Sequence, residues 1–343
     1  MDVIAIDGSY GEGGGQILRT AVGLSVATGQ SIEVFNIRAN RPVPGLKAQH
    51  LWAVKSAAEL CSGKVDCLRE GSTAIKFQPQ KPKNENLKFD IGTAGSITLL
   101  LQALIPAVSR QKGEFRFDVK GGTDVKWSPT LDYFRHIVIP LYSQIGVEVS
   151  LEVRKRGFYP VGGGDISCKI TAKGYLNNIA LKEKTRGKAS IASVCSNLPK
   201  SIAERQLKAA EDFLISNNVE VEGKYANVES AASPGSAICV YFGKGSYIGG
   251  DSIGERAKPS EKVGFEAAKL FFDEYSSDCT LDSHVADMVV PLLALAKNES
   301  VFVTSKRTEH LLTNLHIAKM ITECEYSVEQ LDSGASVVRI TPK

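Results

Sequence analysis

A short segment near the N-terminus combines the residue types that bind phosphate. Gly11-Glu12-Gly13-Gly14-Gly15 puts four glycines around one carboxylate, and Arg19 follows in an apolar run typical of a helix. Glycine lets backbone N–H groups approach an anion closely, and the N-terminus of a helix adds a positive dipole. The pattern therefore favours phosphate binding. The alternative is a glycine-rich hairpin between a strand at Val3–Ile6 and a helix at Gln16–Ala27.

Glu12 needs its own explanation in such a loop. A carboxylate that faces phosphate is repelled by it unless a cation lies between them, so Glu12 is a candidate ligand for a hydrated Mg²⁺ that bridges to phosphate oxygens. The loop has neither the Gly-Lys-Ser/Thr ending nor the G-x-G-x-x-G spacing of the common nucleotide signatures.

His310 is the second candidate for chemistry. It lies within Glu309–Asn314, at a predicted junction between a strand and a helix, where α/β proteins place reactive groups. The alternative is that His310 only caps or packs against that helix. The settings of His50, His136 and His284 are those of ordinary packed or surface residues.

Composition excludes several classes of protein. The 343 residues are 43% apolar and 23% charged, which is typical of globular chains, and the net charge of +3 is too small to indicate nucleic-acid binding by itself. We expect no signal peptide and no membrane segment. The seven cysteines lack CxxC spacing, which favours reduced thiols in the cytoplasm and argues against a structural zinc site.

Apolar periodicity predicts alternating strands and helices, and the order βαβαββ is used more than once. The third round is interrupted by a new pattern that begins with a strand at Lys188–Cys195. A helix at Ser201–Ser216 follows, starting with the serine and glutamate spacing of a capping box. The polar stretch Ser276–Asp278 then returns the chain to the third round. Further predicted helices are Pro44–Cys61, Ser96–Val108, Thr130–Ile145, Ser260–Tyr275, Ser283–Lys297 and Glu309–Ile321.

Three motifs together resemble the RNA 3′-terminal phosphate cyclase family. They are Gly8–Thr20, Arg156–Gly164 and His310-Leu311-Leu312-Thr313-Asn314. The resemblance runs along essentially the whole chain, and it also includes Ile37–Leu46, Gly92–Ser96 and Gly121–Asp124.

The resemblance implies an α/β (α+β) fold with two parts. Residues 1–183 and 279–343 would form a large catalytic domain of three βαβαββ units. Residues 184–278 would form a smaller inserted α+β domain, and the break in periodicity falls at the same place.

The implied reaction is the ATP-dependent conversion of an RNA 3′-phosphate end to a 2′,3′-cyclic phosphodiester. In this family a histidine first takes AMP from ATP, and His310 matches that nucleophile. The AMP then passes to the RNA 3′-phosphate, and the 2′-hydroxyl closes the ring. The implied class is a ligase-type nucleotidyl transfer enzyme of RNA processing that uses ATP with Mg²⁺ or Mn²⁺.

The resemblance also assigns the remaining site residues. Glu12 would hold the divalent ion, and arginines suit forked recognition of phosphate oxygens better than lysines. Phosphate contacts fall on Arg19, Arg38, Arg41 and Gln49, and adenosine contacts on Gln102, Pro129, His284 and Asp287.

Three other interpretations stay open at this point. A non-catalytic RNA-processing relative of the cyclases would lack the adenylated histidine, and the presence of Glu12 and His310 argues against it. An enolpyruvyl transferase on a similar repeated scaffold would leave His310–Asn314 unexplained. A plain nucleic-acid-binding module fits poorly with the small net charge.

The segment Arg156–Gly164 favours a structural role. Pro160 and three glycines between two strands indicate a turn with unusual backbone angles, which explains the motif without chemistry.

Overall fold

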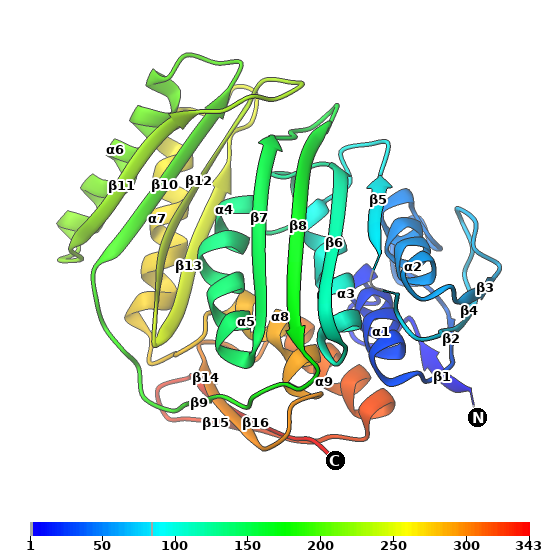
Figure 1. The fold of residues 1–343 in the computed structure, drawn as a ribbon. Coiled ribbons are helices and arrows are strands. Elements are labelled where there is room, and N and C mark those ends of the chain that lie inside the picture. The colour runs from blue at the N-terminus through cyan, green and yellow to red at the C-terminus, as the bar shows by residue number, and fades with distance from the viewer. Residues whose placement is uncertain (1–2, 84) are drawn as a thin grey trace.

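The computed structural model describes residues 3–83 and 85–343. Its strands form four sheets of four strands each, and Figure 1 shows the sheets arranged around a set of packed helices. Three of the sheets share one topology.

The first unit lies on the right of Figure 1 and contains the glycine-rich loop. Its sheet has the order β1-β2-β4-β3, in which β1 and β2 are parallel and the other pairs are antiparallel. The elements are β1 (Ile4–Asp7), α1 (Gly15–Thr28), β2 (Ile32–Phe35), α2 (Ala48–Cys61), β3 (Lys64–Asp66) and β4 (Ile75–Gln78).

The second unit, in the centre of Figure 1, repeats this order as β5-β6-β8-β7. A π-helical turn interrupts the second helix of this unit. The elements are β5 (Asn86–Asp90), α3 (Ile97–Ser109), β6 (Lys112–Gly121), α4 (Leu131–Tyr133), η1 (Phe134–Val138), α5 (Ile139–Ile145), β7 (Val147–Lys155) and β8 (Gly164–Lys173).

The third unit has the order β9-β14-β16-β15, again with one parallel pair at the edge. The elements are β9 (Ala180–Leu181), α8 (Ser283–Leu293), β14 (Ser300–Thr304), α9 (Glu309–Thr322), β15 (Glu325–Gln330) and β16 (Ser336–Thr341). Three units with one βαβαββ order confirm the predicted α/β class.

The chain between β9 and α8 forms the fourth sheet, at the upper left of Figure 1, with the order β11-β10-β12-β13. Two helices pack against each other and against this sheet, and an apolar cluster lies between them. The elements are β10 (Ala189–Ser196), α6 (Ser201–Ser216), β11 (Val221–Val228), β12 (Gly235–Lys244), β13 (Ser246–Ile253) and α7 (Ser260–Ser276). The assignment of residues 184–278 as a separate domain stays a prediction.

The main apolar core spans all three units and is centred on their helices. Helix α1 packs on α3 and α9, and α8 packs on α9, so helices distant in sequence become neighbours. Nearly every residue of α3 is buried, which fits its place between other elements. This packing brings the N-terminal ends of α1 and α9 together.

Two details of the predicted helices are wrong. Helix α2 begins at Ala48 rather than at Pro44, because Gly45 has φ +80° and lies against the carbonyl of Gly71. Helix α6 has no capping box, because Lys200 is its N-cap residue and no side chain caps it. The Ile202 amide instead donates to the Pro199 carbonyl.

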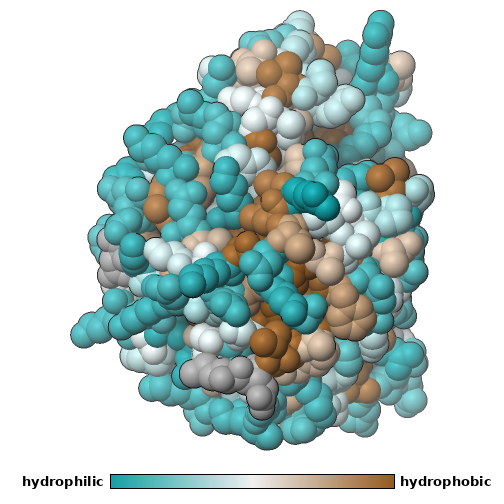
Figure 2. All heavy atoms as spheres, turned by 90° about the vertical axis from the view of Figure 1, so that its right-hand side faces the viewer, coloured by the Kyte–Doolittle hydropathy of each residue, from teal (hydrophilic) through white to brown (hydrophobic). Residues whose placement is uncertain are grey.

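The surface of the first unit is mostly polar. Figure 2 shows hydrophilic side chains over most of this face, with a band of apolar residues down its middle. Exposed apolar side chains of the unit include Val3, Phe35 and Val43. In the part of the chain that the structure describes, no helix combines the length and the apolar character needed to cross a membrane.

Candidate active site

The glycine-rich loop leads from β1 into α1 and is held by its own polar groups. The Asp7 carboxylate accepts hydrogen bonds from the Ser9 amide (2.9 Å) and hydroxyl (2.7 Å), and these bonds lower the pKa of Asp7. Gly11 and Gly13 have positive φ values of 55° and 58°, where glycine has no steric penalty. A side chain at Gly11 would also collide with Thr313 Oγ1 on α9. The loop conformation thus requires glycine.

Two further glycines let other side chains reach the start of α1. A Cβ atom at Gly15 would collide with His50 Nε2, and one at Gly14 would lie 3.3 Å from Arg41 Nη2. The imidazole and the guanidinium therefore approach the N-terminal end of a helix, where backbone N–H groups lack helical partners. This end of α1 has the geometry of an anion site, to which the Arg41 guanidinium adds a positive charge.

His310 lies between two carboxylates at the N-terminal end of α9. The helix is capped by Thr308, whose Oγ1 accepts a hydrogen bond from the Leu311 amide at 3.0 Å. His310 Nε2 lies 3.2 Å from Glu12 Oε2. His310 Nδ1 lies 3.7 Å from Asp287 Oδ2, an ion-pair distance rather than a hydrogen bond. Each ring nitrogen of His310 thus faces an acid from a different element.

These contacts favour the protonated imidazole. Asp287 first of all, and then Glu12, raise the pKa of His310, while partial burial acts in the opposite direction. The side chain of Asp287 is 12% exposed and that of Glu12 is 48% exposed, so water and salt screen the Asp287 charge less. Loss of the charge on either acid would increase the fraction of neutral His310.

The rest of the His310–Asn314 motif locks three helices together. Asn314 accepts a hydrogen bond from the Thr20 hydroxyl of α1 (2.7 Å) and donates one to the Asp287 carbonyl of α8 (2.7 Å). Gln16 of α1 donates to the His310 carbonyl at 2.6 Å. Because these bonds are largely buried, they fix the position of His310 relative to both α1 and α8.

The three predicted phosphate-binding arginines have different surroundings. Arg41 Nη2 lies 3.3 Å from Glu12 Oε2, and both side chains are exposed. Arg19 is half-buried near Gly15. Burial lowers the pKa of Arg19 to about 10 and Asp287 opposes this, so the guanidinium stays charged at neutral pH.

Arg38 is buried and braces the loop that follows it. Its Nη1 donates to the carbonyls of Val43 (2.8 Å) and Gly45 (2.9 Å). Burial lowers the pKa of Arg38, and the charge of Arg41 adds to this effect. Arg38 therefore holds the conformation of the loop at Val43 and Gly45, next to the site.

His50 belongs to this cluster, although the sequence predicts an ordinary packed or surface residue. Its Nδ1 accepts a hydrogen bond from the Lys47 amide at 3.2 Å at the start of α2. Burial, with the charges of Arg19 and Arg38, lowers the pKa of His50 to about 3, so the ring is neutral. No local pattern marks His50, because its place depends on contact between α2 and α1.

The predicted adenosine contacts lie on or next to α3 and α8. Thr98 donates to the Pro129 carbonyl (2.9 Å), and Gln102 follows one turn later on α3. The Gln102 Nε2 atom is buried and lacks a hydrogen-bond partner within the described residues, so it is available to a ligand. The exposed His284 lies in the first turn of α8, one turn before Asp287, and Asp287 contacts His310.

Gln49 lines a cavity and has no hydrogen bond to His310 within the described residues. It belongs to the wall of a cavity of about 1110 Å³ between the second unit and the 184–278 segment. The structure therefore brings Glu12, Arg41, Asp287 and His310 into direct contact. For Gln49, Gln102, Pro129 and His284, it shows no hydrogen bond or ion pair to that cluster among the described residues.

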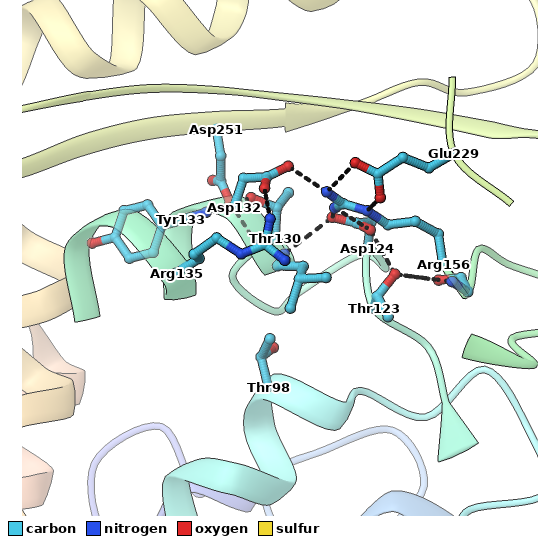
Figure 3. A network of polar contacts seen from close by, with 12 residues as sticks. Thr98, Thr123, Asp124, Thr130, Asp132, Tyr133, Arg135, Arg156, Glu229 and Asp251 are labelled. Atoms are coloured by element: carbon cyan, nitrogen blue, oxygen red, sulfur yellow. Dashed lines mark hydrogen bonds and ion pairs between the residues drawn. The ribbon is translucent and has the colours of Figure 1, made fainter. Parts of the chain in front are cut away.

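The Arg156–Gly164 segment begins with a buried ion-pair network. Arg156 is fully buried and contacts Asp124 (3.1 Å), Asp132 (2.8 Å) and Glu229 (2.8 Å), as Figure 3 shows. Gly162 and Gly163 have positive φ values of 69° and 67°. The expected unusual backbone angles are confirmed.

A divalent ion could bind Glu12 only together with other ligands. The described residues contain no group of three or more His, Cys, Asp or Glu side chains that could hold a metal ion. Mg²⁺ typically binds one or two carboxylates plus phosphate oxygens and water. A single exposed carboxylate beside an anion site fits an ion that arrives with a polyphosphate.

Comparison with known proteins shows similarity along the whole chain. A family model described as RNA 3'-terminal phosphate cyclase matches residues 10–328. A protein of that name from Methanopyrus kandleri is 41% identical, with 100% of both chains covered. Proteins of the same name from Methanosarcina barkeri and Ignicoccus hospitalis are each 42% identical. The match to the Methanosarcina barkeri protein covers 96% of this chain and 97% of that protein. The match to the Ignicoccus hospitalis protein covers 98% of both chains.

Proposed function

The chain belongs to the RNA 3'-terminal phosphate cyclase family and is an ATP-using enzyme of that type, and from this premise we propose that His310 is its nucleophile. The observation that carries the proposal is the position of His310, between two carboxylates and beside a glycine-rich helix N-terminus. In this site the His310 imidazole, the N-terminus of α1 and the positive charge of Arg41 lie close together.

In the first step, His310 Nε2 attacks the α-phosphorus of ATP. The N–P bond forms, the bond to the pyrophosphate oxygen breaks, and His310 carries AMP. Attack requires the neutral imidazole. Asp287 faces Nδ1 and favours the proton there, so Nε2 carries the lone pair once it has lost the proton that faces Glu12.

In the second step, an oxygen of the RNA 3′-phosphate attacks the same phosphorus and releases His310. The 2′-hydroxyl of the terminal ribose then attacks the activated RNA phosphorus, so the five-membered ring closes and AMP leaves. Activation is needed because a phosphate monoester has no good leaving group. The neighbouring hydroxyl supplies proximity without help.

The other residues of the site stabilise charge. Glu12 would hold a Mg²⁺ or Mn²⁺ ion that neutralises pyrophosphate as it leaves. Arg19 and Arg41 hold phosphate oxygens beside the N-terminus of α1, with Gln49 and Arg38 in supporting positions. Gln102, Pro129, His284 and Asp287 border the adenosine.

The test uses RNA oligonucleotides that differ only at the 3′ end. With ATP and Mg²⁺, the 3′-phosphate RNA should become a 2′,3′-cyclic phosphate with release of AMP and pyrophosphate, whereas a 3′-hydroxyl RNA should stay unchanged. An unchanged 3′-phosphate RNA under all metal conditions would favour the non-catalytic relative.

Glu12→Ala should change how adenylation depends on metal. Loss of the only predicted protein ligand should raise the Mg²⁺ concentration for half-maximal adenylation at least about tenfold. The measurement is the rate of covalent labelling with α-labelled ATP across a Mg²⁺ titration. Arg41→Ala is the matched control, because it should lower the rate and leave the midpoint in place. Superimposable titrations for wild type and Glu12→Ala would remove Glu12 from the metal site.

Asp287→Asn should move the acid limb of adenylation to lower pH. Asp287 raises the pKa of His310, so removal of its charge lowers that pKa and keeps the imidazole neutral in more acidic solution. The labelling rate as a function of pH measures the shift, and an NMR titration of His310 without ATP measures it independently. An acid limb that stays in place or moves upward would contradict the assigned role of Asp287.

A further inference from the structure

Two aromatic side chains project into solvent at the cavity between the second unit and the 184–278 segment. Trp127 is 92% exposed and Tyr159 is 78% exposed, and both line this cavity of about 1110 Å³. Large aromatic side chains normally bury most of their surface. Their exposure at one cavity calls for a ligand with flat apolar faces.

The two loops that carry them are joined. Asp124 and Phe158 form a β-bridge, and the amides of Thr123 and Asp124 donate to the Gly157 carbonyl. Trp127 follows three residues after one end of this bridge, and Tyr159 follows directly after the other. The two rings are therefore mounted on one hydrogen-bonded frame.

Trp127 has a backbone conformation that tryptophan rarely adopts. Its φ of +66° is unusual for a bulky aromatic residue. The turn is tied by the Ser128 hydroxyl, which donates to the Val125 carbonyl (2.9 Å), and by an ion pair from Lys126 to Glu255 (2.6 Å). These contacts fix the turn that displays the indole.

The charges at the cavity favour an anionic chain. Lys126 is paired with Glu255, and Lys258 is paired with Glu266. Arg256 is exposed and forms no ion pair within residues 3–83 and 85–343. The guanidinium of Arg256 could contact a phosphate of a single nucleic-acid strand, and the rings of Trp127 and Tyr159 could each stack on a base.

The cavity adjoins the site of chemistry across the first turn of α2. Gln49 lines its wall, and the next residue, His50, contacts Gly15 at the start of α1. The first turn of α2 thus lies between the cavity and the N-terminal end of α1. An RNA strand whose 3′ end lies at the N-terminal end of α1 could continue past α2 into the cavity.

We propose that this cavity binds the single-stranded segment of RNA that precedes the reacting 3′ end, with Trp127 and Tyr159 as base-stacking platforms and Arg256 as a phosphate contact. The proposal rests on the proposed function, because RNA is its ligand. It adds a site for nucleotides that take no part in the reaction, and so predicts a dependence on RNA length.

The test compares a single-stranded RNA of about ten nucleotides, within the usual site size of such grooves, with a dinucleotide, both ending in a 3′-phosphate. Trp127→Ala and Tyr159→Ala should each raise the KM for the longer RNA about tenfold or more, the effect of losing one stacked base. The KM for the dinucleotide and the rate of adenylation by ATP without RNA should stay within about twofold.

Three control variants separate stacking from structure. Trp127→Phe should largely restore the KM, and Trp127→Gly, which relieves the positive φ, should behave like Trp127→Ala without loss of stability. Tyr175→Ala removes another exposed tyrosine, which lies under Lys297, and should leave both KM values unchanged.

A direct binding readout keeps this proposal separate from the catalytic one. The chain has two tryptophans, so Trp52→Phe leaves Trp127 as the reporter, and the longer RNA should quench its fluorescence even where no cyclisation occurs. Quenching without cyclisation would overturn the catalytic proposal alone. Cyclisation with no quenching and unchanged KM values would overturn the proposal that this cavity binds RNA. Trp127 and Tyr159 would then be candidates for contact with a protein partner.

Discussion

His310→Ala should abolish covalent labelling of the protein by α-labelled ATP. Alanine lacks a nucleophilic nitrogen, and no other imidazole of the described residues lies in the position between Glu12 and Asp287. Labelled protein separated on a denaturing gel measures the effect, which should be a loss to background. Because the His310 side chain is half-exposed, its removal should leave the fold intact.

Two other histidines serve as matched controls. His316 lies on the same helix and stacks on Tyr10 at 4.0 Å, and His136 stacks on Tyr241 at 4.2 Å. His316→Ala and His136→Ala should both keep the label. The wild-type adduct should be labile in acid and stable in alkali, as a P–N bond is. Undiminished labelling of His310→Ala, or an adduct with the reverse stability, would reassign the nucleophile to another residue.

The glycine-rich loop shows why part of the candidate site leaves a pattern in the sequence. Gly11 and Gly13 occupy positive φ angles, and Gly14 and Gly15 admit Arg41 and His50. These are local requirements that only glycine meets, so they leave a pattern in the sequence. The cluster of glycines around Glu12 therefore indicates an anion site from residue types and spacing alone.

His50 shows the opposite case. Its neutral ring and its contact with Gly15 arise from the packing of α2 against α1, and nothing in the residues next to it reports that packing. Arg38 is predicted, from the family resemblance, to contact phosphate. Its hydrogen bonds to Val43 and Gly45 depend on a loop conformation that residue type does not reveal.

Strand β13 is not predicted from the sequence, and the reason again is tertiary packing. Gly249 and Gly250 weaken the strand pattern, and they are there because neighbours approach closely. A Cβ atom at Gly249 would meet the Tyr133 ring at 2.6 Å, and one at Gly250 would collide with the Phe271 amide of α7. The glycines mark tight packing of this strand between helices, and periodicity alone does not distinguish such a strand from a loop.

Arg156→Leu should be the most destabilising single change outside the candidate active site. The guanidinium is fully buried and pairs with Asp124 and Asp132, which are buried as well. Its removal leaves acids without a counter-charge in the interior, which costs about 3–5 kcal/mol. Denaturant unfolding at neutral pH, followed by circular dichroism, measures the loss against wild type.

The dependence on pH tests whether charge is the cause. Burial raises the pKa of Asp132, and Arg156 opposes that rise, so without Arg156 the folded-state pKa of Asp132 should lie higher still. An acid whose pKa is higher in the folded state binds its proton more tightly there, so the deficit of the variant should shrink as pH falls through that pKa. Arg154→Leu changes an arginine of β7 just before Arg156 that is exposed and paired with Asp118 and Asp165, and it should change stability little at any pH. An Arg156→Leu protein with wild-type unfolding and lost cyclisation would instead make Arg156 a participant in the chemistry.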